Sequence, residues 1–139
     1  MVETVQKSFT RKVLRKLNIQ YSSYQDRLKQ LKLRSLEYRR LQFDLILVYK
    51  ILNNLIESHN NPPAFILSNL NTTYNLRRHS LYIEKPQKAR TQTRQNFFLY
   101  RIINVWNNLP DSLVTSPNLQ TFKQKLKQFD LSTIHNFII

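Results

Sequence analysis

The chain has 139 residues, contains no glycine and no cysteine, and carries a formal net charge of +14 at pH 7. The missing glycine excludes Walker-type phosphate loops and the dinucleotide-binding fingerprint, since both need backbone that approaches phosphate without a Cβ. The missing cysteine excludes disulfides, zinc knuckles, iron–sulfur sites and thiol nucleophiles. Hydrophobic residues make up 41% of the chain, too many for a disordered polycation, so the composition predicts a modest folded core and a polyanionic partner.

The first predicted element is an amphipathic helix over residues 2–17. Its apolar residues recur at spacings of three and four, which places them on one face. Its basic residues Lys7, Arg11 and Arg15 lie opposite, as a solvated face or as phosphate contacts. The apolar residues, with Phe9 expected in the core, are Val2, Val5, Phe9, Val13 and Leu17.

Two further helices follow before residue 58. Ser23 followed by Asp26 is typical of a capping box and predicts a short basic helix that includes Leu28. Ser35 starts the longest helix, expected over residues 36–57 and ended by the Asn-Asn-Pro-Pro run at 60–63. Its apolar seam, which we expect to be buried against a partner helix, is Leu41, Leu45, Val48, Leu52 and Leu55.

Residues 76–94 are basic and rich in polar side chains, with Glu84 as their single acid. Tyr82 and His79 are interleaved with the cations, a mixture that suits single-stranded nucleic acid because cations follow the backbone and rings stack on bases. A polar connection with one short strand at residues 81–83 explains the composition equally well.

The C-terminal part predicts two helices and a tail. Phe98 to Leu109 has helical periodicity and is ended by Pro110, with Trp106 as a core anchor. Ser116 and Pro117 predict the N-cap and first residue of the next helix, which buries Phe122 and Leu126. The apolar residues 131–139 are expected to fray unless they dock.

The fold class predicted from these elements is mainly α. Three N-terminal helices and two C-terminal helices form two small subregions, joined by a basic, loop-rich segment. The expected divisions are 1–58, 59–95, 96–130 and 131–139. The side chains expected in the core are Phe9, Leu45, Leu52, Phe98, Trp106, Leu109, Phe122 and Leu126.

The residues predict no catalytic or metal site. The eight acidic residues are scattered, whereas metal-dependent nucleotide chemistry needs carboxylates that converge on a cation pair. His59, His79 and His135 lack partners at metal-ligand spacing. We therefore expect no cofactor, no metal and no enzymatic activity of this chain. The N-terminal residues have no signal-peptide pattern and no apolar run reaches a membrane span, which predicts a nuclear or cytoplasmic protein with no membrane partner.

An ordered set of short motifs resembles a known family, the C-terminal region of reverse transcriptases from non-LTR retrotransposons of the jockey-like and chicken-repeat-like kinds. The likeness covers about residues 3 to 129 in the family's order. Its most specific block is Trp106-Asn107-Asn108-Leu109-Pro110 after Asn96-Phe97-Phe98. The other segments are Val5 to Arg11, Tyr24 to Leu33, Leu36 to Leu41, Asp44 to Ile46, Tyr49 to Leu52, Arg101, Val114 and Phe122-Lys123.

The resemblance implies a piece that follows the polymerase palm, without the palm's catalytic aspartates and without the endonuclease. Relatives often have glycine where this chain has Phe43, Asn54 and Arg78, so the loop geometry at Arg78 is open to question. The resemblance also implies a role in holding template RNA or target DNA. The phosphate contacts expected on this basis are Lys7, Arg11, Arg15, Arg39, Arg40, Arg77, Arg78 and Arg94.

Two functions are compatible with the sequence. The favoured one is a non-catalytic module that binds RNA or DNA through the phosphate backbone. The alternative is a protein-interaction module or an inert remnant, whose apolar seams pack against the upstream polymerase thumb.

Overall fold

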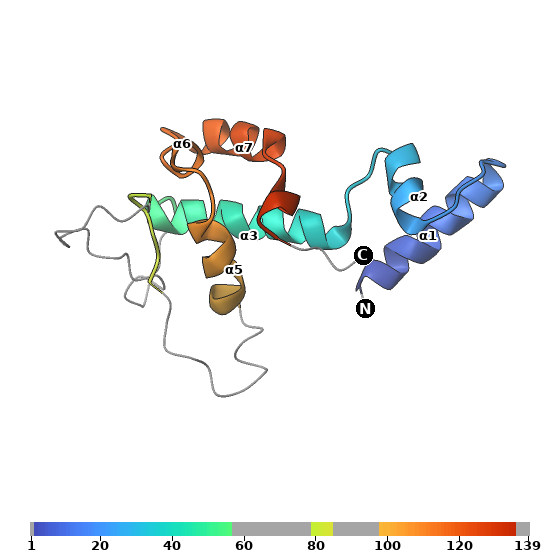
Figure 1. The fold of residues 1–139 in the computed structure, drawn as a ribbon, viewed down its shortest axis with the longest axis horizontal. Helices are drawn as coiled ribbons and strands as arrows, with labels where there is room; N and C mark the ends of the chain where they lie inside the picture. Colours follow the sequence, from blue (N-terminus) through green and yellow to red (C-terminus); the bar gives the residue numbers. More distant parts are fainter. Residues whose placement is uncertain (1, 57–78, 85–97, 136–139) are drawn as a thin grey trace. The chain divides into compact units, whose positions relative to one another are not determined.

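A computed structural model describes residues 2–56, 79–84 and 98–135. The predicted mainly helical fold is confirmed, and the described residues contain no strand element. No helix among them is long and apolar enough to cross a membrane. In chain order the elements are α1 (Val2–Lys16), α2 (Tyr24–Gln30), α3 (Leu36–Leu52), α5 (Phe98–Asn107), α6 (Asp111–Val114), α7 (Leu119–Gln128) and the 3₁₀ turn η1 (Leu131–Thr133) (Figure 1).

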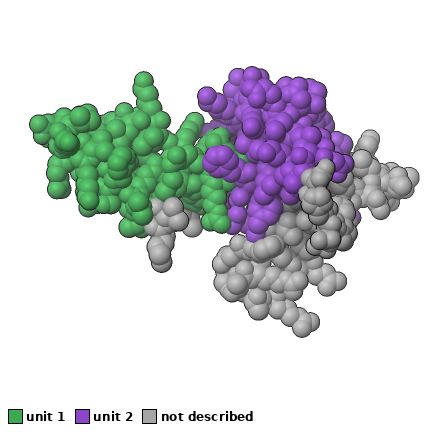
Figure 2. All heavy atoms as spheres, turned by 180° about the vertical axis from the view of Figure 1, so that it is seen from behind, with its two compact units in different colours: residues 1–42, 136–139 green, residues 43–135 purple. Residues whose placement is uncertain are grey.

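The chain divides into two compact units, and the division falls inside α3, between Gln42 and Phe43 (Figure 2). The described residues of unit 1 are 2–42. Those of unit 2 are 43–56, 79–84 and 98–135. Most of the expected connector, residues 59–95, lies outside the described part of the chain.

In unit 1, α1 buries a polar row of side chains instead of the apolar face that its spacing predicts. Gln6, Thr10 and Leu14 are buried, whereas Phe9 is 59% exposed. The prediction of Phe9 as a core residue is therefore wrong. The polar row is tolerated in the interior because it forms hydrogen bonds: Thr10 Oγ1 donates to Gln6 O at 2.9 Å, and Gln6 Nε2 donates to the carbonyl of Arg34 at 3.1 Å.

The carboxylate of Glu3 connects α1 to both other helices of unit 1. Its Oε2 accepts hydrogen bonds from the backbone amides of Leu36 at 3.1 Å and Glu37 at 3.4 Å, in the first turn of α3. Its Oε1 accepts from the hydroxyl of Tyr24 in α2. Amides in a first helical turn have no intrahelical acceptor, and the helix dipole favours a negative charge there. Glu3 therefore caps α3 from a separate helix.

The start of α2 confirms the predicted cap. Ser23 is the N-cap, and its hydroxyl accepts from the amide of Asp26 at 3.1 Å. The Asp26 carboxylate reaches back to the amide of Ser22 at 3.0 Å, one residue earlier than in a standard capping box. Ser35 likewise starts α3, since its Oγ accepts from the amide of Tyr38 at 3.1 Å.

Two residues after the last residue of each of the first three helices comes a non-glycine residue with positive φ: 53° at Asn18, 52° at Lys32 and 53° at Asn54. This left-handed residue closes a Schellman motif, in which the next amide donates to the carbonyl five residues earlier. The three bonds run from Ile19 to Leu14 at 3.0 Å, from Leu33 to Leu28 at 2.8 Å and from Leu55 to Lys50 at 2.8 Å.

The left-handed turn at Asn54 ends α3 at Leu52, earlier than the predicted residue 57. The predicted seam is shortened accordingly. Leu41, Leu45 and Val48 are buried, Leu52 is half-buried, and Leu55 is exposed because it follows the end of the helix.

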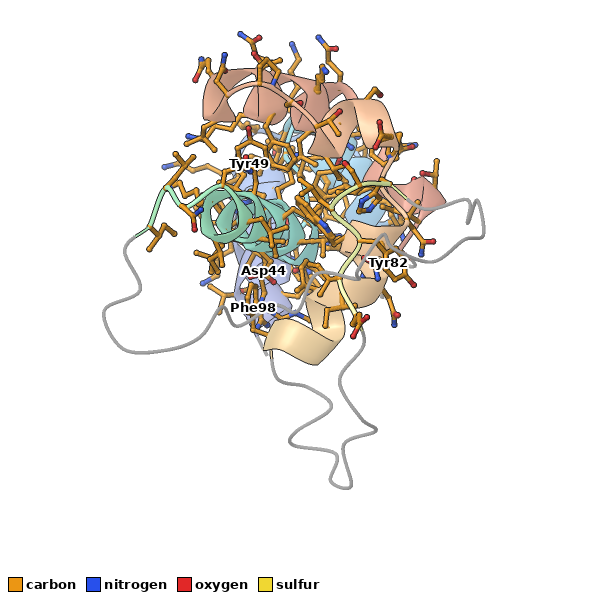
Figure 3. All side chains as sticks on the ribbon, turned by 90° about the vertical axis from the view of Figure 1, so that its left-hand side faces the viewer. Asp44, Tyr49, Tyr82 and Phe98 are labelled. Carbon is orange, nitrogen blue, oxygen red and sulfur yellow. The ribbon has the colours of Figure 1, made fainter. Side chains whose placement is uncertain are left out.

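Unit 2 packs α5 and α7 against the second half of α3. Tyr49 lies on the side of α3 that faces α7 (Figure 3), where its ring stacks on Phe122 at 4.3 Å between centroids. Its hydroxyl donates to the carbonyl of Ser116 at 2.6 Å. Toward α5, Asp44 forms an ion pair with Arg101 at 2.6 Å. Of the predicted core residues in this unit, Leu45, Trp106, Leu109, Phe122 and Leu126 are buried, and Leu52 and Phe98 are half-buried.

The residues before α7 correct the predicted helix start. Asn118, not Ser116, is the N-cap, and its Oδ1 accepts from the amide of Thr121 at 2.8 Å. Ser116 belongs instead to the turn after the unpredicted short helix α6, where its Oγ donates to the carbonyl of Leu113 at 2.6 Å. In the predicted tail, Leu131 in η1 is buried.

The end of α5 binds residues 79–84, where a short strand was one of the two expectations. The indole Nε1 of Trp106 donates to the carbonyl of Leu81 at 2.9 Å, and the side-chain amide of Asn107 bonds to the backbone of Ile83. These bonds come from side chains, and Ile83 in addition forms an isolated β-bridge. The most specific block of the resemblance thus has a structural role in this chain.

Candidate nucleic-acid interface

A buried arginine lies at the centre of unit 1. Arg27 in α2 is only 6% exposed. Its Nε donates to Thr10 Oγ1 at 3.2 Å, and its guanidinium lies 5.0 Å from the ring centroid of Tyr21 and 5.4 Å from that of Tyr24. Two electron-rich faces and a hydroxyl acceptor offset part of the cost of burying the charge. Arg27 forms no ion pair with the described residues, so none of their carboxylates is paired with its charge.

Cations from three helices gather around the ring of Tyr24. The Nζ of Lys7 in α1 lies 5.2 Å from the ring centroid, Arg27 in α2 lies over the same ring, and the charge of Arg39 in α3 acts on the hydroxyl. Burial, followed by the hydrogen bond to Glu3, raises the pKa of Tyr24 well above its usual value, so the hydroxyl stays neutral. The ring therefore fixes Lys7 beside the three-helix junction.

The outer cations of unit 1 are open to solvent. Arg11 and Arg15 follow Lys7 at intervals of four, which places the three on one side of α1. Arg11, Arg15, Arg39 and Arg40 are exposed. Within the described part of unit 1, neither Arg11 nor Arg15 forms an ion pair. These side chains are accessible to an external anion.

The acidic residues of unit 1 do little to neutralise this surface. Residues 1–42 contain eleven basic and three acidic side chains, a net charge of +8. The carboxylate of Glu3 accepts hydrogen bonds from Tyr24 and from α3, and that of Asp26 accepts from the amide of Ser22 and from Gln30. The carboxylate of Glu3 joins the three helices and that of Asp26 stabilises the start of α2, while the arginines at 11, 15, 39 and 40 remain exposed.

Five of the eight predicted phosphate contacts lie in unit 1: Lys7, Arg11, Arg15, Arg39 and Arg40. Arg77, Arg78 and Arg94 lie outside the described residues. Sequence reasoning missed Arg27 and the role of Tyr24. The spacing of three residues between them, on one face of a short helix, was the available signal.

Unit 2 has a buried histidine, His79, whose environment is structural. Its Nε2 lies 3.1 Å from the carbonyl oxygen of Trp106. A carbonyl only accepts hydrogen bonds, so Nε2 carries the proton and Nδ1 is left without a partner. Burial lowers the pKa of His79 below its usual value near 6.5.

No metal-binding geometry is present in the described residues: nowhere do three or more His, Asp or Glu side chains gather as a metal site would need. Asp44, the acid beside the core seam, is used in the ion pair with Arg101. The arrangement in unit 1 is suited to binding an anion by charge.

Comparison with protein-family models, with curated proteins and with solved structures finds no match to this chain.

Proposed function

We propose that this chain is a non-catalytic module that binds RNA or DNA through the phosphate backbone, mainly by the cations of unit 1. The observation that carries the proposal is the net charge of +8 in residues 1–42 together with the exposure of Arg11, Arg15, Arg39 and Arg40. Phosphate contacts supply most of the affinity of a protein that does not read base sequence.

Rigidity supports this proposal as well. The half-buried Lys7 lies against the ring of Tyr24, and Glu3 ties α1 to α2 and α3. A cation that is already held in place loses less side-chain entropy when it binds phosphate. The resemblance to the region behind the palm of non-LTR reverse transcriptases points to the same class of ligand.

A salt titration tests the proposal. Binding of the full chain to a fluorescein-labelled oligothymidylate is measured by anisotropy from about 50 to 200 mM KCl. We expect the logarithm of the association constant to fall linearly with the logarithm of salt concentration, with a slope of about −0.7 for each phosphate contacted. No binding at about 50 mM salt would overturn the proposal.

Two matched double variants locate the contacts. Arg11→Gln with Arg15→Gln is expected to reduce the magnitude of the salt slope by about one to two, because two phosphate contacts are lost. Lys123→Gln with Lys127→Gln removes the same charge from exposed positions on α7 in unit 2, and we expect a smaller change. An equal change in both would show non-specific attraction by net charge in place of an interface on unit 1.

Primer extension tests the prediction that this chain has no polymerase activity. Primer extension by the purified chain with Mg²⁺ and deoxynucleotides is expected to give no product, since the resemblance places the catalytic aspartates outside this region. Extension that survives repurification would contradict the non-catalytic part of the proposal.

A further inference from the structure

The outer face of α1 combines exposed apolar side chains with exposed lysines. Val5 is 69% exposed, Phe9 59% and Leu17 58%. These residues and the half-buried Val13 recur at intervals of four, so they form one ridge that runs along α1 and ends at Leu17, directly after the helix. Lys12 and Lys16, also exposed, follow Phe9 by three and seven residues and lie on the same side.

This face is separate from the contacts that hold unit 1 together. The fold uses Glu3, Gln6, Thr10 and Leu14 of α1, which form a neighbouring row about a quarter of a turn away around the helix. A ridge of exposed apolar side chains is costly in water and is typical of a binding surface. The packing of unit 1 does not account for it.

We infer that the outer face of α1 binds an unpaired nucleic-acid strand, with a base stacked on the ring of Phe9 and phosphates held by Lys12 and Lys16. The inference rests on the proposed function and names the kind of nucleic acid. A single strand offers both apolar base faces and anionic phosphates, which are the two features that this face complements. A duplex hides its base faces by stacking and offers α1 only its phosphates.

The choice of a single strand over other occupants follows from charge. The lysines beside the ridge, and the net charge of +8 in residues 1–42, oppose contact with a second copy of the same face. An acidic amphipathic helix would match the charge, but its aliphatic side chains would not need an aromatic ring at Phe9. The aromatic ring of Phe9 is therefore the feature that distinguishes binding of a single strand from binding of an acidic helix.

Substitutions at Phe9 test the inference in the full chain. Phe9→Leu keeps the apolar character and removes the ring, whereas Phe9→Tyr keeps the ring. Anisotropy is measured with a labelled oligothymidylate of about 15 nucleotides, and with the same strand paired to oligoadenylate. We expect Phe9→Leu to weaken single-strand binding about fivefold or more, with Phe9→Tyr close to the wild type and duplex binding nearly unchanged by either variant.

Phe43→Leu is the matched control, because Phe43 is 70% exposed on α3 and lies in unit 2. We expect single-strand binding by this variant to equal that of the wild type. Circular dichroism should show the same helix content in all three variants, since both phenylalanines are exposed and their replacement leaves no cavity.

The outcomes separate this inference from the proposed function. Normal binding and a normal salt slope in Phe9→Leu would overturn the stacking role and leave the phosphate-binding proposal standing. Equal losses in Phe9→Leu and Phe43→Leu would overturn the assignment to α1. Competition of an acidic amphipathic peptide for this face, undiminished in Phe9→Leu, would identify a protein-docking surface instead. Absence of binding by the wild type would overturn both proposals.

Discussion

The side chain of Asn107 pairs with the backbone of Ile83 as a neighbouring strand would. Its Nδ2 donates to the carbonyl of Ile83 at 2.8 Å, and its Oδ1 accepts from the amide of the same residue at 3.0 Å. Only a side chain with an adjacent donor and acceptor can form both bonds. The last residue of α5 thus pairs with both the backbone donor and the backbone acceptor of Ile83.

This pairing predicts the effect of Asn107→Asp. The ionised carboxylate can still accept from the amide of Ile83, but it places a second acceptor against the carbonyl. We expect the free energy of unfolding to fall by about 1–3 kcal/mol, measured by urea denaturation followed by circular dichroism. Asn108→Asp is the control, because the exposed Asn108 directly follows α5 and its side chain donates to the carbonyl of Asn104, one turn earlier. Equal losses in the two variants would contradict the structural role of Asn107.

Glu3→Gln is expected to loosen the junction of unit 1. The amide keeps one acceptor oxygen and loses the negative charge that favours the start of α3. We expect a loss of about 1–2 kcal/mol and faster hydrogen exchange of the amides of Leu36 and Glu37, detected by NMR. Glu84→Gln removes an exposed charge from unit 2 and should leave those two amides unaffected. Unchanged exchange in Glu3→Gln would show that water replaces the carboxylate without cost.

His79 makes the stability of unit 2 depend on pH. Its pKa in the folded chain is below the usual value near 6.5, chiefly because of burial, while the hydrogen bond to the carbonyl of Trp106 and the nearby Asp111 act in the opposite direction. Below pH 6.5 the unfolded chain binds more protons than the folded chain, so stability is full above this pH and is lost as the pH falls further. The fluorescence of the single tryptophan, Trp106, follows unfolding beside His79.

Two variants isolate the effect of His79. His79→Gln should flatten the pH dependence of the urea midpoint between pH 7 and about pH 5, whereas His135→Gln should preserve it. A dependence that survives in His79→Gln would assign it to another group.

Glycine at position 32 is expected to stabilise the chain. Lys32 has a φ of 52°, which costs a residue with a Cβ more than it costs glycine. Lys32→Gly should therefore raise the free energy of unfolding by about 0.5–1 kcal/mol. Lys29→Gly, inside α2, should lower it by a similar amount, about 1 kcal/mol. The two substitutions remove the same side chain. A change of the same sign in the free energy of unfolding of both variants would therefore contradict the role of the positive φ at Lys32. Asn18→Gly and Asn54→Gly should stabilise less, because asparagine tolerates this conformation better.

Local signals in the sequence were sufficient for much of the fold. Ser23 and Asp26 predict the start of α2 because capping involves neighbouring residues only. The same logic misplaces the start of α7. Both Ser116 and Asn118 are residue types that cap helices, but the hydroxyl of Ser116 donates to the carbonyl of Leu113 and only Asn118 caps α7. Lys32 gave no signal at all, since a lysine in the left-handed region is unusual and is fixed by the Schellman bonds around it.

The candidate site was less predictable than the helices. The helical periodicity of residues 2–17 correctly predicts α1. Which face is buried depends on the partners of Glu3, Gln6 and Thr10, which lie in or before the other two helices of unit 1 and far along the sequence. An amphipathic pattern shows only which residues are hydrophobic, so it does not predict hydrogen bonds between distant polar side chains. The exposed cations were predictable from charge alone, whereas the burial of Arg27 between two tyrosine rings needed the three-dimensional structure.

The unequal interiors of the two units have a calorimetric consequence. Of the described residues, five buried hydrophobic side chains belong to unit 1 and fourteen to unit 2. Newly exposed apolar area is the main source of the heat-capacity increase on unfolding, and exposed polar groups reduce it. Unfolding of unit 2 should carry most of that increase. The unfolding enthalpy of unit 1, which is held by hydrogen bonds around Glu3, Thr10 and Arg27, should depend less on temperature than that of unit 2.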